Sequence, residues 1–134
     1  MHKISLQWQA DELFRVSQNG KTLLIDGADE ATAEGFRPKP LILSALAGCT
    51  AIDVVEILRK MRAEFSAFSI DVEADMTEEH PKVYHSVRLV YRIRVPEGDR
   101  HKVERAVQLS QEKYCGVSAM VRRFANLEYR IEYL

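Results

Sequence analysis

Cysteine is scarce in this 134-residue chain, which contains only Cys49 and Cys115, 66 positions apart (115 minus 49). Such a pair forms neither a disulfide framework nor a Cys-x-x-Cys metal or redox motif. The four histidines show no HExxH or paired metal-ligand spacing, so no metal site is expected. The six glycines never cluster into a phosphate-binding loop, and the GxSxG motif of serine hydrolases is absent. We therefore expect no cofactor and no nucleotide.

An excess of charge of either sign is also missing, since 19 Lys and Arg residues face 20 Asp and Glu residues. With 46% apolar residues, this composition excludes disorder and argues against a basic surface for nucleic acid. The first residues lack the apolar core of a secretory signal, and Asp53 and Glu56 interrupt the longest apolar stretch. We expect a soluble cytoplasmic protein without membrane association, built as a single domain over residues 1–134.

Alternating apolar and polar residues predict several strands. Residues 4–8 alternate as in a half-buried strand, and Asn19-Gly20 between two further runs predicts a tight hairpin turn. Residues 26–37 are small, polar and acidic, and are expected to form a loop. Residues 68–76 alternate strictly and residues 87–95 largely, one with acidic and the other with basic outward positions, which favours antiparallel pairing. Residues 127–133 predict the last strand.

Two helical regions separate these strands. The first is expected to begin near Pro38 or Pro40, to run to about Arg62, and to be apolar nearly all round in its first half, as in a central buried helix. The second follows Asp99, a plausible N-cap, and Gly116 is placed to interrupt it. Its expected apolar stripe includes Ser110, Tyr114 and Phe124. The order βββ-α-ββ-α-β, with hairpin-type connections, predicts an α+β fold with a long central helix.

Cys49 begins a polar stripe on the first helix that continues through Asp53, Glu56 and Lys60. A free cysteine more often serves as a small buried hydrophobe, and an acid at a helix edge more often marks the solvated boundary. Asp53 lies within an apolar run, where an unpaired charge is costly, so it should have a buried partner. Cys115 would lie at the start of a short helix, where free amides favour a thiolate. Spacing alone does not show whether the two cysteines meet.

The segments PKPLILSALAGCTAIDVVEILRKMR and AVQLSQEKYCGVSAMV resemble the OsmC/Ohr superfamily, specifically its YhfA-like branch. The carrying motifs are a proline-led helix with GCTAIDVV and a later helix with LSQEKYC, in that order. The resemblance implies an intertwined homodimer in which two long central helices pack at the interface. In peroxidase members of the family the first cysteine attacks an organic hydroperoxide and the second resolves the sulfenic acid as a disulfide. Those roles correspond to Cys49 and Cys115, with a dithiol as the later reductant.

The sequence departs from the peroxidase pattern at the start of the central helix. Those members place a glutamate soon after the leading proline, paired with an arginine that stabilises the thiolate, whereas this chain has Pro38-Lys39-Pro40. Arg15 and Arg37 are the arginines considered for that role, and Lys39 is an alternative source of positive charge. Asp53 or Glu56 is the alternative source of the acid.

Two functions therefore remain open from the sequence. The first is a cofactor-free, homodimeric, thiol-dependent peroxidase that reduces organic hydroperoxides through Cys49 and Cys115. The second is a noncatalytic protein of the same fold that binds a small hydrophobic ligand at the dimer interface, with both thiols reduced and inert. The missing glutamate favours the second, and the presence of both cysteines favours the first.

Overall fold

The computed structural model describes all residues, 1–134, and contains two three-stranded sheets and a long helix. The chain divides into two compact units, Met1–Leu43 and Ser44–Leu134, and helix α1 (Pro38–Lys60) contributes residues to both. Each unit is described by itself. The α+β class is confirmed, and the single domain over residues 1–134 stays a prediction.

The first unit holds an antiparallel sheet of three strands in the order β1 (Ser5–Ala10), β2 (Leu13–Gln18) and β3 (Lys21–Asp26). The predicted turn at Asn19-Gly20 is confirmed, because both residues have positive φ angles, 47° and 77°. A two-residue turn of this kind matches the natural twist of a hairpin.

The expected loop after β3 is confirmed, and Asp26 organises it. Its carboxylate accepts hydrogen bonds from the backbone N–H groups of Ala28 and Glu34, both at 2.9 Å. These two hydrogen bonds hold the pKa of Asp26 below its usual value, because they stabilise the charged form. The loop returns to the sheet at Phe36, whose N–H donates to the Leu24 carbonyl.

The second unit is built on a sheet in the order β4 (Ser66–Met76), β5 (Tyr84–Arg94) and β6 (Asn126–Tyr133). The predicted antiparallel pairing of the acidic and basic strands is confirmed. Arg88 pairs with Glu73 and Asp75, and Arg92 pairs with Asp71 and Glu132. These pairs lie on the outward face, so they set the register more than they stabilise the sheet.

The sequence placed a helix between the last two strands but did not predict how those strands pair. Strand β6 pairs parallel to β5, from Ser86 opposite Asn126 to Ile93 opposite Tyr133. Parallel neighbours need a crossover, and the chain supplies one through α2 (Arg100–Leu109), the π-helical turn η2 (Ser110–Tyr114) and α3 (Gly116–Val121). The alternation of apolar and polar residues along a strand does not show which other strand it will pair with.

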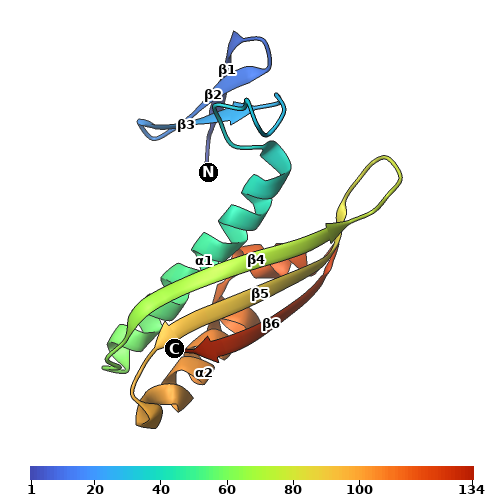
Figure 1. Ribbon diagram of the computed structural model, residues 1–134. Helices are drawn as coiled ribbons and strands as arrows, with labels where there is room; N and C mark the ends of the chain where they lie inside the picture. The colour runs from blue at the N-terminus through green and yellow to red at the C-terminus, as the bar shows by residue number, and fades with distance from the viewer. The chain divides into compact units, whose positions relative to one another are not determined.

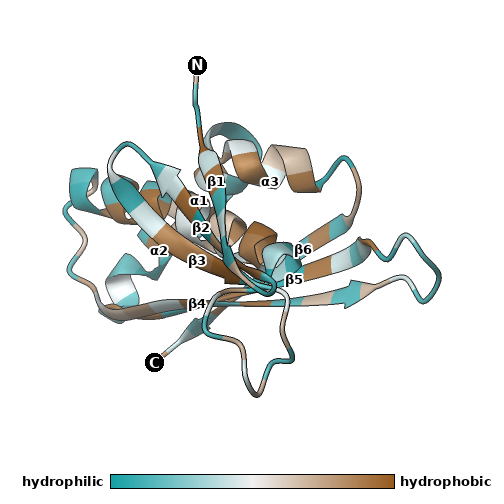
Figure 2. Ribbon diagram, turned by 90° about the horizontal axis from the view of Figure 1, so that it is seen from above, coloured by the Kyte–Doolittle hydropathy of each residue, from teal (hydrophilic) through white to brown (hydrophobic).

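Within this unit the helices cover one face of the sheet, as both views show (Figures 1 and 2). The core forms where every second residue of β5 meets the helices, and the buried side chains from α1 repeat at intervals of four. The fully buried residues that meet here are Leu46, Thr50, Val54 and Leu58 from α1, Val87, Tyr91 and Ile93 from β5, and Val103, Ala106 and Val107 from α2.

Helix α1 ends at Lys60, two residues before the expected limit. The following Arg62 has a φ of 57°, and the Ala63 N–H donates to the Leu58 carbonyl at 3.0 Å, as in a left-handed C-terminal cap. By length and composition alone α1 is suited to crossing a membrane, a property it shares with core helices of soluble proteins. Its first half is less buried than expected, because Ile42 is 42% exposed.

Two details of the second helical region were wrong. Asp99 precedes α2 without capping it through its side chain, and its carboxylate instead pairs with Lys102 at 3.1 Å. The apolar stripe was expected to include Tyr114 and Phe124, but both are about half exposed. The stripe fails there because the wider η2 turn and the break at Cys115 change the angular position of each later residue.

Candidate functional site

Two distant segments bring both cysteines and an acid together in the second unit. Cys49 and Asp53 lie one turn apart on α1, and Cys115 is the N-cap residue of α3. Their two sulfur atoms and a carboxylate oxygen all lie within 4.8 Å of one another. We call these three residues the thiol–carboxylate cluster. The cluster joins three of the residues that the sequence singled out.

The backbone around Cys115 explains how its side chain reaches the helix. The η2 turn ends with the Cys115 N–H donating to the Ser110 carbonyl at 2.8 Å. Cys115 is then extended, with φ −76° and ψ 98°, before α3 begins at Gly116. This break confirms the predicted interruption at Gly116, and π-helical turns of this kind are frequent at functional sites.

The two thiols differ in exposure. Cys49 is half-buried, whereas Cys115 is only 3% exposed. Burial raises the pKa of the Cys115 thiol, and the neighbouring Cys49 thiol acts in the same direction. The Ser118 N–H donates to the Cys115 sulfur at 3.3 Å, and Ser118 acts to lower that pKa but does not offset burial. The expectation that the helix start would favour a thiolate at Cys115 is therefore wrong, because desolvation dominates.

Asp53 has the buried partner that its apolar surroundings required. The hydroxyl of Ser110 donates to its carboxylate at 2.8 Å, and Ser110 is fully buried. Ser110 also bonds to Thr50 at 2.7 Å, and Thr50 bonds to Tyr91 at 2.7 Å. Gln111 donates from its side-chain amide to the Tyr91 hydroxyl at 2.7 Å. A continuous hydrogen-bonded chain thus connects the cluster to the centre of the sheet.

The donor inventory fixes the direction of this chain. Each hydroxyl has one hydrogen to donate, and the Ser110 hydrogen is committed to the Asp53 carboxylate. Thr50 must then donate to Ser110, and Tyr91 must donate to Thr50. Burial raises the pKa of Tyr91 to about 12, so the phenol keeps its proton at neutral pH. The chain therefore runs from Gln111 to Asp53 with every donor pointing toward the carboxylate.

Arg122 anchors the far end of the chain. Its guanidinium donates to the backbone carbonyl of Gln111 at 2.7 Å and to the side-chain oxygen of Gln111 at 2.8 Å. These two bonds orient the Gln111 amide so that its N–H groups face Tyr91. Arg122 therefore acts as a positioning residue for the network.

Glu56 lies outside the cluster. It is exposed and lines a shallow pocket that also includes Asp53. The remaining lining residues are Ile57, Lys60, Leu109 and Tyr114, so the polar stripe expected along α1 does form one wall of a pocket. Tyr114, which the sequence placed in the core, closes the pocket from the η2 turn.

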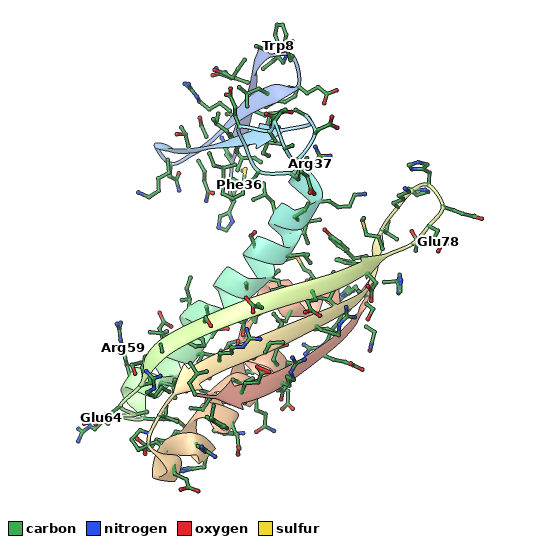
Figure 3. All side chains as sticks on the ribbon, viewed as in Figure 1. Trp8, Phe36, Arg37, Arg59, Glu64 and Glu78 are labelled. Atoms are coloured by element: carbon green, nitrogen blue, oxygen red, sulfur yellow. The ribbon has the colours of Figure 1, made fainter.

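The three cationic residues that the sequence offered as stabilisers of the thiolate all belong to the first unit. Arg15 is exposed on β2, and Lys39 is exposed in the first turn of α1. Arg37 lies directly before α1 (Figure 3), donates to the Ala28 carbonyl, and helps to lower the pKa of Asp26. Arg37 thus has a structural role within its own unit.

The sequence analysis missed most of the hydrogen-bonded chain. Two signals were present, because a tyrosine within the apolar face of a strand and a serine within the apolar stripe of a helix both need buried partners. Thr50, next to Cys49, gave no such signal. The missed residues are Thr50, Tyr91, Ser110, Gln111 and Arg122.

Comparison with known proteins shows which proteins this chain is similar to in sequence and in fold. The family model described as OsmC-like protein matches residues 30–130. Protein YhfA of Escherichia coli (strain K12) is 33% identical over 116 residues, covering 87% of this chain and 85% of its own. An OsmC-like protein from Mycoplasma pneumoniae has a TM-score of 0.88 at 13% identity, covering 100% of this chain and 97% of its own. The organic hydroperoxide resistance protein OhrB of Bacillus subtilis has a TM-score of 0.65 at 13% identity, covering 98% of each chain.

Proposed function

Because the chain belongs to the OsmC-like family, we propose that it is a thiol-dependent peroxidase that reduces organic hydroperoxides. One observation carries the proposal: two cysteines 66 positions apart (115 minus 49) have sulfur atoms within 4.8 Å, although neither is disulfide-bonded. The organic hydroperoxide resistance protein among the relatives of the same fold names the substrate class.

The difference in burial supports a division of roles between the two thiols. Cys49 is the half-buried one and is the attacking thiol, because a hydroperoxide must reach it. Its thiolate attacks the terminal peroxide oxygen, which forms an S–O bond and releases an alkoxide that takes a proton to become the alcohol. Cys49 is oxidised to the sulfenic acid in this step, and the hydroperoxide is reduced.

Cys115 resolves the intermediate. Its sulfur attacks the Cys49 sulfenic acid, a disulfide forms, and the hydroxyl leaves as water with the Cys115 proton. The raised pKa of Cys115 suits this role, because the thiol keeps its proton until the sulfenic acid is present. An external dithiol then takes up the disulfide by exchange and restores both thiols.

Single-turnover oxidation of the reduced protein tests the proposal. Cumene hydroperoxide should convert the wild type to an intramolecular disulfide, and Cys49→Ser should consume no peroxide. Cys115→Ser should consume one equivalent and leave a sulfenic acid at Cys49 that dimedone traps. We also expect cumene hydroperoxide to react faster than hydrogen peroxide, since only the former can bury hydrocarbon against the apolar residues that flank Cys49 on α1.

Two results would contradict the proposal. Equal loss of single-turnover reactivity in both cysteine variants would refute the assignment of roles. Failure of the wild type to react with any hydroperoxide, with both thiols titrating as free, would instead support the noncatalytic protein that binds a hydrophobic ligand.

A further inference from the structure

The thiol–carboxylate cluster combines two soft sulfur donors with one hard oxygen donor at close range. We propose that, in the reduced protein, Cys49, Asp53 and Cys115 form a binding site for a thiophilic divalent cation, with Zn²⁺ as its representative. The cysteine spacing gave no reason to expect such a site, because the ligands come from α1 and from the start of α3. Only the fold brings them together.

The distances suit tetrahedral coordination after small side-chain movements. Zinc–sulfur bonds of about 2.3 Å place two sulfur ligands roughly 3.8 Å apart in a tetrahedron. The donor atoms here lie within 4.8 Å of one another, so rotations of the cysteine side chains bring them into range. Three protein ligands leave one coordination position for water or a small ligand.

Charge also favours a cation at this position. Two thiolates and a carboxylate this close together repel one another, and burial of Cys115 adds to the cost of the anionic state. A divalent cation removes that repulsion by displacing the two thiol protons, which are released to solvent as the two metal–sulfur bonds form. The metal changes no oxidation state, so binding needs no other reactant.

The surroundings of the cluster already orient its ligands. Ser110 donates to the Asp53 carboxylate, and the Ser118 N–H donates to the Cys115 sulfur. Hydrogen bonds to ligating atoms of this kind are a regular feature of metal sites. The fully buried Ser118 hydroxyl has no oxygen or nitrogen partner, and its side chain acts on the Cys115 sulfur as a further polar group beside this ligand.

Titration of the reduced full-length protein with Co²⁺ tests the site directly, in the presence of a phosphine reductant and without peroxide. We expect one Co²⁺ per chain, with a thiolate-to-cobalt charge-transfer absorption and the strong visible bands of a tetrahedral ion. Zn²⁺ should displace Co²⁺ and abolish both signals. Competition with a chromophoric chelator then gives the zinc affinity of each variant.

The variants separate the cluster from nonspecific binding. At known metal sites, removal of an outer hydrogen-bond partner alone weakens metal binding by about 10- to 100-fold. Cys49→Ser and Cys115→Ser should therefore each weaken zinc binding by on the order of 100-fold or more. Asp53→Asn should weaken it by on the order of 10-fold. Glu112→Gln is the matched control, since Glu112 lies exposed in η2 beside the cluster and should bind like wild type. Circular dichroism of each variant checks that it is folded.

The absence of a charge-transfer band in wild type, with two titratable thiols per chain, overturns the proposal. Zinc affinity that Cys115→Ser leaves unchanged overturns it as well. The outcome is independent of the peroxidase proposal, because metal binding is measured without peroxide and peroxide reduction is measured in chelator. A folded wild type that binds Zn²⁺ through both thiols supports the site even if it reduces no hydroperoxide.

Discussion

At the scale of single residues, Tyr91 shows how a polar group is accommodated in an apolar core. Its side chain is fully buried, and its hydroxyl donates to Thr50 while accepting from Gln111. Its ring also meets Tyr129 edge to face, with 6.0 Å between ring centres. Because each partner has a further partner, the network stabilises the core rather than leaving a buried group unpaired.

The Tyr91→Phe substitution should lower the free energy of unfolding by about 1–3 kcal/mol at pH 7, since it removes the buried hydroxyl that donates to Thr50 and accepts from Gln111. The loss of unfolding free energy caused by Tyr91→Phe should be smaller at alkaline pH. The pKa of Tyr91 is raised from 10.0 to about 12 by burial, so wild type loses stability as the unfolded phenol ionises above pH 10.

A pKa shift of two units corresponds to roughly 3 kcal/mol of unfolding free energy. Wild type alone loses this stability between pH 10 and 12, because the variant has no phenol at this position. Urea unfolding of both proteins across this range measures the difference, and the subtraction removes the effect of other groups. Cys115 and Tyr129 also act on Tyr91 and are present in both proteins. A difference in unfolding free energy that stays constant from pH 8 to 12 would contradict the buried, protonated phenol.

At the scale of secondary-structure elements, the loop of residues 26–37 returns to β3, and this return depends on a close backbone approach at Gly35. A Cβ atom there would lie 2.7 Å from the carbonyl carbon and oxygen of Leu24. That carbonyl accepts from the Phe36 N–H at 2.8 Å, and the Asp26 N–H donates to the Phe36 carbonyl at 3.0 Å. The backbone cannot move away without breaking these bonds.

Gly35→Ala should therefore open the loop and reduce the stability of the first unit by about 1–3 kcal/mol. Hydrogen exchange at the amides of Asp26 and Phe36 reports on the contact directly, and both should lose protection. Gly98→Ala is the matched control, because a Cβ atom there would meet nothing within 4 Å. Equal protection of the two amides in wild type and Gly35→Ala would show that the loop does not depend on the close approach.

At the scale of the whole molecule, α1 has a face that its own chain leaves uncovered. Its buried residues repeat at intervals of four, from Leu46 to Leu58, and the opposite side includes Ile52, which is 62% exposed. An apolar helix face of this kind is typical of a subunit interface. We therefore propose that the protein is a homodimer.

Light scattering at low micromolar concentration should give twice the chain mass of 15.4 kDa. Ile52→Glu should shift the population toward monomer, because it would bury a charge at the interface. Val83→Glu changes an apolar residue of similar exposure in the β4–β5 connection and should leave the dimer intact. A folded wild-type monomer under these conditions would contradict the proposal.

Hydrophobic periodicity determined most of the elements of this protein, and the motifs GCTAIDVV and LSQEKYC indicated its family by resemblance. The strands, the Asn19-Gly20 turn and the start of α1 depend on short-range patterns. Apolar residues that recur every two positions in a strand, or about every four in a helix, mark the face that is buried. The importance of Cys49, Asp53 and Cys115 also followed from the sequence, through the stripe on α1 and the resemblance to a known family. The need of Asp53 for a buried partner followed from its apolar neighbours.

Only the tertiary structure decided the distances, hydrogen bonds and burial that relate these residues to one another. The parallel pairing of β6, the 4.8 Å cluster and the chain from Gln111 to Asp53 all join segments far apart in sequence. The rise in the pKa of Cys115 reverses the local effect of the helix start, because desolvation depends on every segment packed around the sulfur. Local patterns fix which face of an element is apolar, whereas distances, burial and hydrogen-bond partners arise only when those faces meet.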